Sequence, residues 1–143
     1  MVAVSAWATT PVEVAKLIAE DGASNDFFGF SIAFSDDTAV IGALRDDDNG
    51  VDSGAVYVFT RFGTNWSQQT KLTAVDSGAG DEFGGKVALD GDIAVIGARL
   101  DDDNGVDSGS AYVFTRSGTA WSHQAKLTAS DGAAGDEFGY SVA

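Results

Sequence analysis

The stretch DDDNGVDSG occupies residues 46–54 and returns letter for letter at residues 101–109. The offset between the two copies is 101 − 46 = 55, and the rest of the chain keeps the same step. Aligned without a gap, residues 28–82 and 83–137 are identical at 37 of 55 positions. A fixed period is the signature of repeat architectures. The chain therefore contains a tandem duplication, and its fold depends on how one repeat packs on the next.

Each repeat carries four short runs of alternating or continuous apolar residues, a pattern that predicts an all-β fold. The links after the first and third runs are short enough for hairpins. We therefore expect four antiparallel strands, in sequence order, in each repeat. The expected strands are residues 28–34, 38–43, 54–61 and 66–74, followed by 83–89, 93–98, 110–116 and 121–129.

A repeated four-stranded antiparallel unit predicts the blades of a β-propeller, in which neighbouring blades cover each other's faces. The two blades are residues 28–82 and 83–137. The second run of each repeat is apolar on both faces and is expected inside its sheet. The small pairs Gly42–Ala43 and Gly97–Ala98 are expected to let neighbouring sheets approach closely. A two-sheet sandwich made of two identical halves is the alternative.

The two ends of the chain predict an incomplete ring. Residues 11–19, within an N-terminal segment 1–27, align with the fourth runs and are expected to be the last strand of a preceding blade, although PVEVAKLIAED (11–21) also fits a helix. Residues 138–143 are expected to be the first strand of an unfinished blade. Propellers close with about four to eight blades. We therefore expect a segment of a longer propeller or a homo-oligomer formed through the open edges, with rearranged terminal strands as a third alternative.

The composition narrows the classes of partner. Twenty-two acidic against eight basic residues give a formal charge of −14, which repels nucleic acids and anionic membrane surfaces and attracts cations. No cysteine is present, so disulfides, zinc–thiolate sites and thiol nucleophiles are excluded. No apolar run is long enough to span a membrane, and the opening MVAVSAWATT lacks the basic region of a signal peptide. We expect a soluble chain without membrane insertion or an export signal.

The motifs of each repeat resemble the FG-GAP repeat, a family that includes the blades of the integrin α-subunit propeller and many bacterial surface proteins. The resemblance rests on FG at the start of the repeat, VIGA in the second run, the Asp-rich loop and then SGxxYVFTR, in this order in both copies. It implies a non-catalytic, extracellular or cell-surface module for adhesion to, or recognition of, a protein or a glycan. The alternatives are a purely structural repeat and a lectin-like or enzymatic unit that works only when assembled.

The chain departs from the family pattern in a turn-forming proline and in the loop of the integrin calcium site. Leu44 and Arg99 stand where the family name expects the proline of Gly-Ala-Pro. The loop between the first and second strands, which carries an Asp-x-Asp-x-Asp-Gly calcium site in integrin blades, is here only SDDT or DGD. Such a loop is too short to encircle an ion, so the integrin site does not transfer to its usual place.

The Asp-rich loops are instead the candidate calcium sites. Calcium takes about six to eight oxygen ligands, and a loop with alternating carboxylates and a glycine at its bend supplies several of them. A turn held by hydrogen bonds from its own Asp and Asn side chains is the alternative. The candidate ligating residues are Asp46, Asp48, Asn49, Gly50 and Asp52 in the first repeat and Asp101, Asp103, Asn104, Gly105 and Asp107 in the second.

The remaining polar and aromatic motifs are expected to be structural. GDEFG at 80–84 and 135–139 is typical of a turn between blades, and Trp66 and Trp121 are expected to pack over a sheet face. The one histidine, His123, lies in a polar run and is expected at the surface. Neither a nucleophile elbow nor a phosphate-binding loop is present, and we predict no enzyme active site.

Overall fold

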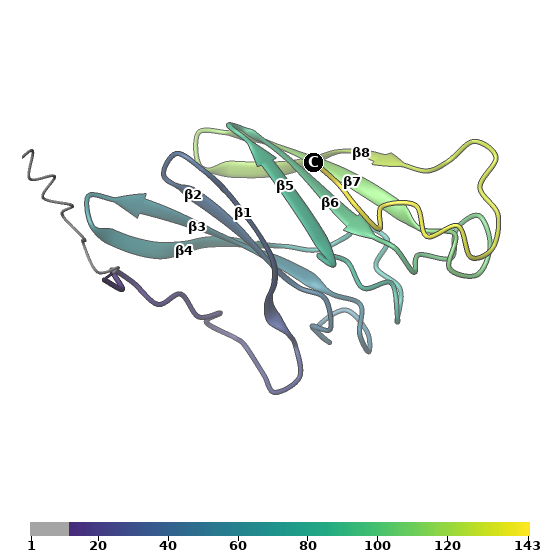
Figure 1. Ribbon diagram of the computed structural model, residues 1–143, viewed down its shortest axis with the longest axis horizontal. Helices are drawn as coiled ribbons and strands as arrows, with labels where there is room; N and C mark the ends of the chain where they lie inside the picture. Colours follow the sequence, from purple (N-terminus) through teal and green to yellow (C-terminus); the bar gives the residue numbers. More distant parts are fainter. Residues whose placement is uncertain (1–11) are drawn as a thin grey trace, which may run out of the picture.

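The computed structural model describes residues 12–143, and all regular structure in that part of the chain is β-strand (Figure 1). Eight strands form two four-stranded antiparallel sheets, each with its strands in sequence order. The strands are β1 (Phe28–Ser35), β2 (Thr38–Ala43), β3 (Ala55–Phe62), β4 (Asn65–Leu72), β5 (Lys86–Asp90), β6 (Ile93–Ala98), β7 (Ser110–Ser117) and β8 (Ala120–Leu127). The described residues form no helix that is long and apolar enough to cross a membrane. The prediction of two consecutive four-stranded units is confirmed.

Tight turns set the order of the strands. Ser35 pairs with Thr38 at the end of β1, so two residues make the turn and the strands must run antiparallel. The expected strands agree with the observed ones to within a few residues, except that β5 begins at Lys86 rather than at residue 83. The reason is that the amide of Phe83 donates to the carbonyl of Ser53 in the preceding repeat, at 3.0 Å.

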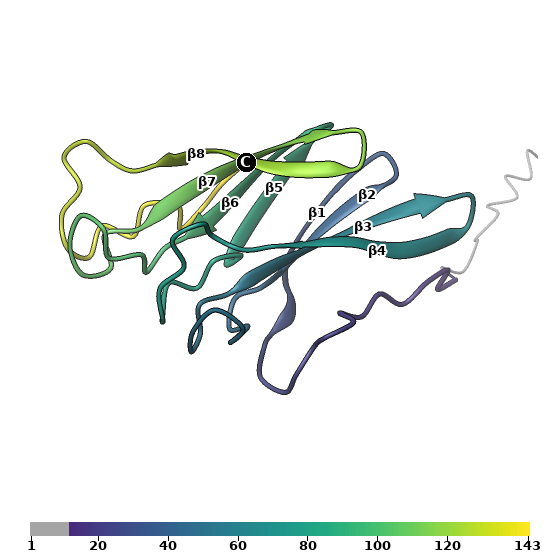
Figure 2. The same cartoon turned by 180° about the vertical axis from the view of Figure 1, so that it is seen from behind.

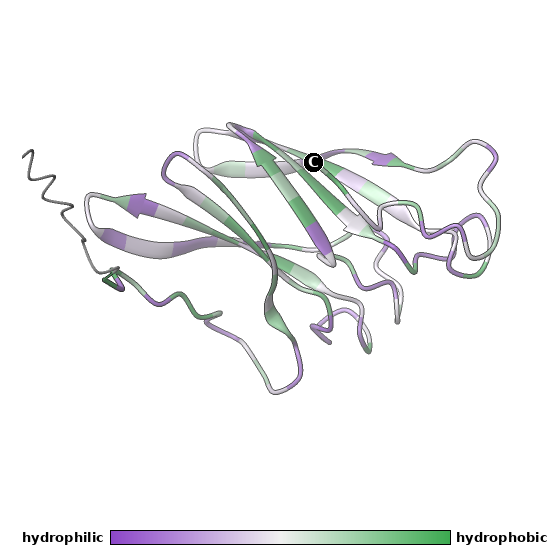
Figure 3. Cartoon of the chain, in the orientation of Figure 1, coloured by the Kyte–Doolittle hydropathy of each residue, from purple (hydrophilic) through white to green (hydrophobic). Residues whose placement is uncertain are grey.

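The two sheets pack face to face as neighbouring blades do, with β1 closest to β5 and the outer strands spreading apart (Figure 2). Val40 and Val58 of the first sheet meet Ile96 and Phe114 of the second in one buried core. Figure 3 shows apolar residues along much of the strands, whereas β4 is largely polar. Every residue of β2 is buried, which confirms the second run as an inner strand.

Two glycines allow the repeats to approach closely. A Cβ atom on Gly42 would lie 2.0 Å from the carbonyl oxygen of Gly84, and one on Gly97 would lie 2.1 Å from that of Gly139. Real Cβ atoms do not come so near another atom, so each position excludes a side chain. The expected role of these small residues is confirmed.

The terminal segments follow the sheets without joining them. Residues 12–27 form no strand, and the residues before them lie outside the described part of the chain. Leu17 and Ala19 nevertheless pack against the first sheet. Residues 138–143 make a single parallel bridge, to Gly109, and no strand. The expected terminal strands therefore do not form: residues 12–27 form no ladder, and residues 138–143 approach β6 and β7 at Phe138 and Gly139 without extending the pairing.

The sheets do not close into a ring, and two faces stay open. Ile32 on β1 is 62% exposed, whereas Val87, its counterpart on β5, is 7% exposed because it packs against the first sheet. The architecture is that of incomplete propeller blades.

Candidate functional site

The two Asp-rich loops link β2 to β3 and β6 to β7, at the end of the sheets opposite the hairpin turns (Figure 1). Hydrogen bonds within the loop close it: the amide of Gly54 donates to the carbonyl of Asp46 at 2.9 Å, and the carboxylate of Asp47 accepts from the amide of Asp52 at 2.7 Å. The second loop repeats both bonds, at 2.9 and 2.8 Å. At Gly50 φ is 138°, a value that favours glycine.

The first carboxylate of each loop is buried. Asp46 accepts a hydrogen bond from the hydroxyl of Tyr57 on β3 at 2.7 Å and contacts the ammonium of Lys71 on β4 at 2.8 Å. A buried carboxylate is tolerated only when it is paired and hydrogen-bonded. Lys71 supplies the opposite charge, and Tyr57 supplies the hydrogen bond.

Asp101 has the same partners and one more. It accepts from the hydroxyl of Tyr112 at 2.9 Å, from the ammonium of Lys126 at 2.8 Å and from the hydroxyl of Ser110 at 3.0 Å. The first repeat has Ala55 in place of the serine, so its buried carboxylate lacks this donor.

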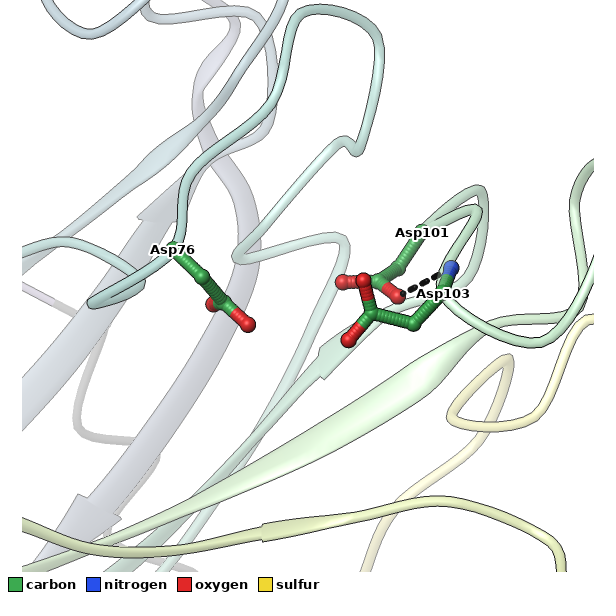
Figure 4. A group of neighbouring side chains, drawn as sticks. All are labelled: Asp76, Asp101 and Asp103. Carbon is green, nitrogen blue, oxygen red and sulfur yellow. Dashed lines mark hydrogen bonds between the residues drawn. The ribbon is translucent and has the colours of Figure 1, made fainter.

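A third carboxylate reaches the second loop from the preceding repeat. Asp76, in the connection after β4, approaches Asp101 and Asp103 from a separate loop (Figure 4). Its two oxygens accept from Lys126 at 2.7 Å and from Tyr112 at 2.8 Å. Asp103 contacts the same ammonium. Lys126 thus joins three carboxylates that come from two repeats.

The first loop has the same arrangement. Asp21 lies 3.0 Å from the ammonium of Lys71, which also contacts Asp48. Asp21 precedes the first repeat, just as Asp76 precedes the second repeat. We call these groups the lysine clusters: Asp21, Asp46, Asp48, Tyr57 and Lys71 in the first, and Asp76, Asp101, Asp103, Tyr112 and Lys126 in the second.

The electrostatics of the second cluster favour the ion pairs. Burial opposes the charge of Lys126, but hydrogen bonds to Asp101, Asp103 and Asp76 outweigh it and raise the pKa of the lysine. Burial of Asp101 is likewise outweighed by Lys126 and by donors in the loop, so the pKa of this carboxyl is lowered. Burial raises the pKa of the Tyr112 phenol. At neutral pH the cluster therefore holds a charged ammonium, ionised carboxylates and a neutral phenol.

The backbone of each loop also pairs with the connection that leads into the next repeat. The carbonyls of Val51 and Asp52 accept from the amides of Gly80 and Glu82 at 2.8 and 3.2 Å. The second loop pairs in the same way with residues 135–138. We call this backbone pairing, together with the neighbouring lysine cluster, the joint between repeats.

Part of the predicted calcium ligand set meets at one point, since Asp101 and Asp103 offer carboxylate oxygens within 4.8 Å of one another and of Asp76. Asp46 and Asp48 face Lys71, whereas Asp52 lies 4.0 Å from Arg45 on another side of the loop. In the second loop the carboxylate of Asp102 accepts from the backbone amide of Asp107, and the carboxylate of Asp103 contacts Lys126. A full calcium shell takes roughly six to eight converging oxygens, and the three carboxylates at Lys126 would supply part of it.

The asparagines and glycines of the predicted set shape the loops. The backbone amide of Asn104 donates to the hydroxyl of Ser108 at 3.2 Å, and Asn49 borders a hollow beside residues 73–77. Gly50 and Gly105 form the bends with positive φ. Among the described residues, the carboxylates whose oxygens lie within 4.8 Å of one another are those of Asp76, Asp101 and Asp103, around Lys126. Calcium binding stays a prediction.

Sequence reasoning missed the lysines, the tyrosines and the carboxylates that precede each repeat. One signal was available: Lys71 and Lys126 are separated by one period of the duplication, as are Asp21 and Asp76. These residues reach the Asp-rich loops only because of how β3, β4 and the connections pack. The period of the sequence does not predict that packing.

Two of the other motifs have the expected structural roles. In GDEFG, the carboxylate of Asp81 accepts from the amide of Gly78 at 2.7 Å, which closes a turn, and burial raises the pKa of this carboxyl. Trp121 packs beside the inter-sheet core and donates from its indole to Gln69 of the other sheet at 3.0 Å. Trp66 packs against the first sheet in the same manner.

His123 departs from expectation. It is half-buried, with its ring 5.6 Å from the ring of Phe114, and its Nε2 has no hydrogen-bond partner among the described residues. The polar neighbours in the sequence predicted a surface position, but alternate residues of β8 face the first sheet.

A family model described as FG-GAP repeat matches residues 11–59, 66–114 and 121–143. The three matches start at residues 11, 66 and 121, which are one period of the duplication apart. The first two matches run from the fourth strand position of one blade to the third strand of the next blade. Each of these units therefore spans a joint. Comparison with curated proteins gives no significant match.

Proposed function

The chain belongs to the FG-GAP repeat family, and we propose that it acts outside the cell as a non-catalytic propeller segment that recognises a partner protein through its acidic loop end. We call this surface the acidic rim. It consists of the exposed carboxylates of Asp47, Asp48, Asp102 and Asp103. The observation that carries the proposal is that both repeats place these loops at the same end of adjacent sheets (Figure 1).

Charge and exposure suit the acidic rim for a cationic partner. The chain carries a formal charge of −14, which speeds encounter with a basic surface. Val51 and Val106, at the loop tips between the carboxylates, are 68% and 66% exposed. A valine ringed by charges offers apolar contact with a polar border, as the centre and edge of a protein interface do.

The test is binding of a Lys-rich peptide to the immobilised chain, with a Glu-rich peptide of equal length as the negative probe. The double variant Asp47→Asn and Asp102→Asn removes two rim charges and keeps an oxygen to accept the loop amide. We expect it to weaken binding several-fold, and high salt to weaken binding further. The matched control is Asp36→Asn with Asp90→Asn, which removes equal charge at the hairpin end. Equal loss in both variants would contradict recognition by the rim.

A glycan is the second candidate partner, at a different place. Near the inner edge of the sheets, a hollow of about 230 Å³ is lined by Phe30, Lys86, Arg99 and Tyr140 among others. Aromatic faces beside polar donors are the usual lining of a small-ligand site. A glycan array tests this proposal, and binding that survives Tyr140→Ala would place the glycan elsewhere.

Calcium has no part in this proposal. The sequence predicted it at the Asp-rich loops, but the carboxylates nearest to one another surround an ammonium group. Calcium remains the alternative resident of the lysine clusters.

A further inference from the structure

We infer that the ε-ammonium groups of Lys71 and Lys126 are the resident cations of the Asp-rich loops, and that they join one repeat to the next without a metal ion. The inference rests on the contacts of the lysine clusters and needs no partner at the acidic rim, with which the clusters share Asp48 and Asp103.

The ammonium of Lys126 is surrounded by carboxylates in the way that a bound metal ion would be. Its three protons meet three carboxylates, those of Asp76, Asp101 and Asp103. The ring of Tyr112 lies 5.2 Å away and adds a cation–π contact. The lysine side chain is only 16% exposed, so the group is largely withdrawn from water. No donor of the ammonium is left for another partner.

The first repeat reproduces the arrangement independently. The ammonium of Lys71 meets Asp21, Asp46 and Asp48, and it lies 5.1 Å from the ring of Tyr57. The two clusters differ in their neighbours, since one lies between the sheets and the other beside the N-terminal segment. The same coordination in two surroundings indicates that the repeat itself specifies it.

An ammonium and a calcium ion exclude each other at this position. The carboxylate oxygens of the second cluster lie within 4.8 Å of one another, and Nζ of Lys126 is within hydrogen-bond distance of each carboxylate. Calcium would need ligands at about 2.3–2.6 Å, so it would have to displace the ammonium from the same space. The displaced lysine would then lose three charged hydrogen bonds.

The ammonium also decides which segments meet. Asp76 comes from the connection after β4, whereas Asp101 and Asp103 come from the loop after β6. Without a cation these carboxylates repel one another, and the hydrogen bond from Tyr112 is the side-chain contact that Asp76 would keep with the second repeat. Lys126 therefore acts as a positioning residue of the joint.

The test compares thermal unfolding of the whole chain with calcium and with a chelator. We expect the wild-type melting temperature to be the same in both. Lys126→Met keeps the length of the stem and removes the charge, and we expect a lower melting temperature in chelator that rises by several degrees with calcium, since a ligand of the folded state stabilises it by mass action. Lys16→Met is the matched control, because Lys16 aligns with Lys126 two periods earlier in the chain and is exposed.

Terbium luminescence reads the site directly, because Tyr112 lies beside it. We expect emission that saturates in Lys126→Met, stays at background in the wild type and in Lys16→Met, and falls when Asp103→Asn is added to Lys126→Met. Should Lys126→Met not fold under either condition, Lys71→Met gives the same comparison at the first cluster.

Two results would overturn the inference. One is a wild-type chain that calcium stabilises and that loses this response with Asp103→Asn, because the loop then prefers a metal ion to the ammonium. The other is a Lys126→Met chain as stable in chelator as the wild type, because the ammonium then contributes nothing to the joint.

Discussion

The carboxylate of Asp76 accepts a hydrogen bond of 2.8 Å from the hydroxyl of Tyr112, across the joint between two repeats. The same hydroxyl lies 2.9 Å from Asp101. A phenol has one proton, so it donates to one of these carboxylates at a time. Lys126 is the group that keeps both carboxylates in place, and the joint therefore depends on charge as well as on shape.

Replacing Asp76 is expected to weaken the joint. Asp76→Ala removes an acceptor from Tyr112 and Lys126, which we expect to lower the free energy of unfolding by about 1–2 kcal/mol. Asp131, one period later and exposed, is the matched position, and Asp131→Ala should stay within about 0.5 kcal/mol of the wild type. Urea unfolding measures both. Equal effects would mean that the contact with Tyr112 and Lys126 carries no stability.

A methyl group at the closest approach of the repeats is expected to force them apart. At Gly42 the added Cβ would meet the backbone of Gly84, inside the ordered joint between the sheets. We expect Gly42→Ala to cost about 1–3 kcal/mol, as overpacking of a filled interior does. Gly97→Ala makes the same clash with Gly139, in a segment that forms no strand and has room to move, and should cost less. Chemical denaturation of both variants gives the comparison, and the reverse order would contradict it.

The two repeats differ by one hydroxyl group beside the buried carboxylate: the second repeat has Ser110 where the first has Ala55. Ser110 donates to Asp101 at 3.0 Å, and we expect Ser110→Ala to cost about 1.5–3 kcal/mol, the range for hydrogen bonds to charged groups. Ala55 holds the equivalent position beside Asp46, so Ala55→Ser should leave stability unchanged or raise it. Calorimetry of the two single variants decides this. A loss of stability in Ala55→Ser would show that the first loop holds its carboxylate differently.

A polar substitution is expected to destabilise the fold more on β5 than at the equivalent apolar position on β1. Val87 is buried between the sheets, so Val87→Ser should cost about 2 kcal/mol or more through lost apolar burial. Ile32→Ser should change stability by less than about 0.5 kcal/mol, because Ile32 is exposed. The homo-oligomer predicted from the sequence is measured on the same chains by light scattering. If copies pair through this open face, Ile32→Ser will lower the apparent mass.

The pH dependence of stability follows from the directions of the pKa shifts. Asp76 and Asp101 have folded-state pKa values below the ordinary 3.8, so they stabilise the fold above pH 3.8 and this contribution is lost as the pH falls through the folded values. Lys126 has a pKa raised above 10.5, so its contribution is complete below pH 10.5 and is lost as the pH rises further. The buried Asp81, whose pKa is raised, opposes the acid loss.

We therefore expect a melting temperature that is level around neutrality and falls at both extremes. The acid fall should be smaller in Lys126→Met, because its carboxylates no longer gain from ionisation. Melting curves measured across the pH range check this, and an acid fall of unchanged size would contradict the assignment to the lysine cluster.

Much of the fold could be predicted from local patterns. The alternation of apolar residues and the two-residue turns give the strands, because both act between neighbours in the sequence. The exclusion of side chains at Gly42 and Gly97 could also be predicted, since their runs are apolar on both faces. The outcome at the termini could not, because residues 11–19 and 138–143 have the strand pattern, but the described residues of these segments extend no ladder.

The sequence by itself determined the period of the repeat, the antiparallel order of its strands and the turn chemistry of the Asp-rich loops. Only the tertiary structure decided what neutralises the loops. An acidic loop has the same composition whether a metal ion or an ammonium balances it, and the choice depends on which long side chain the sheet brings within reach. Lys126 is 25 residues from Asp101 and 50 from Asp76. They meet because β7 and β8 pair in register and the preceding repeat packs against them, and no local pattern encodes either distance.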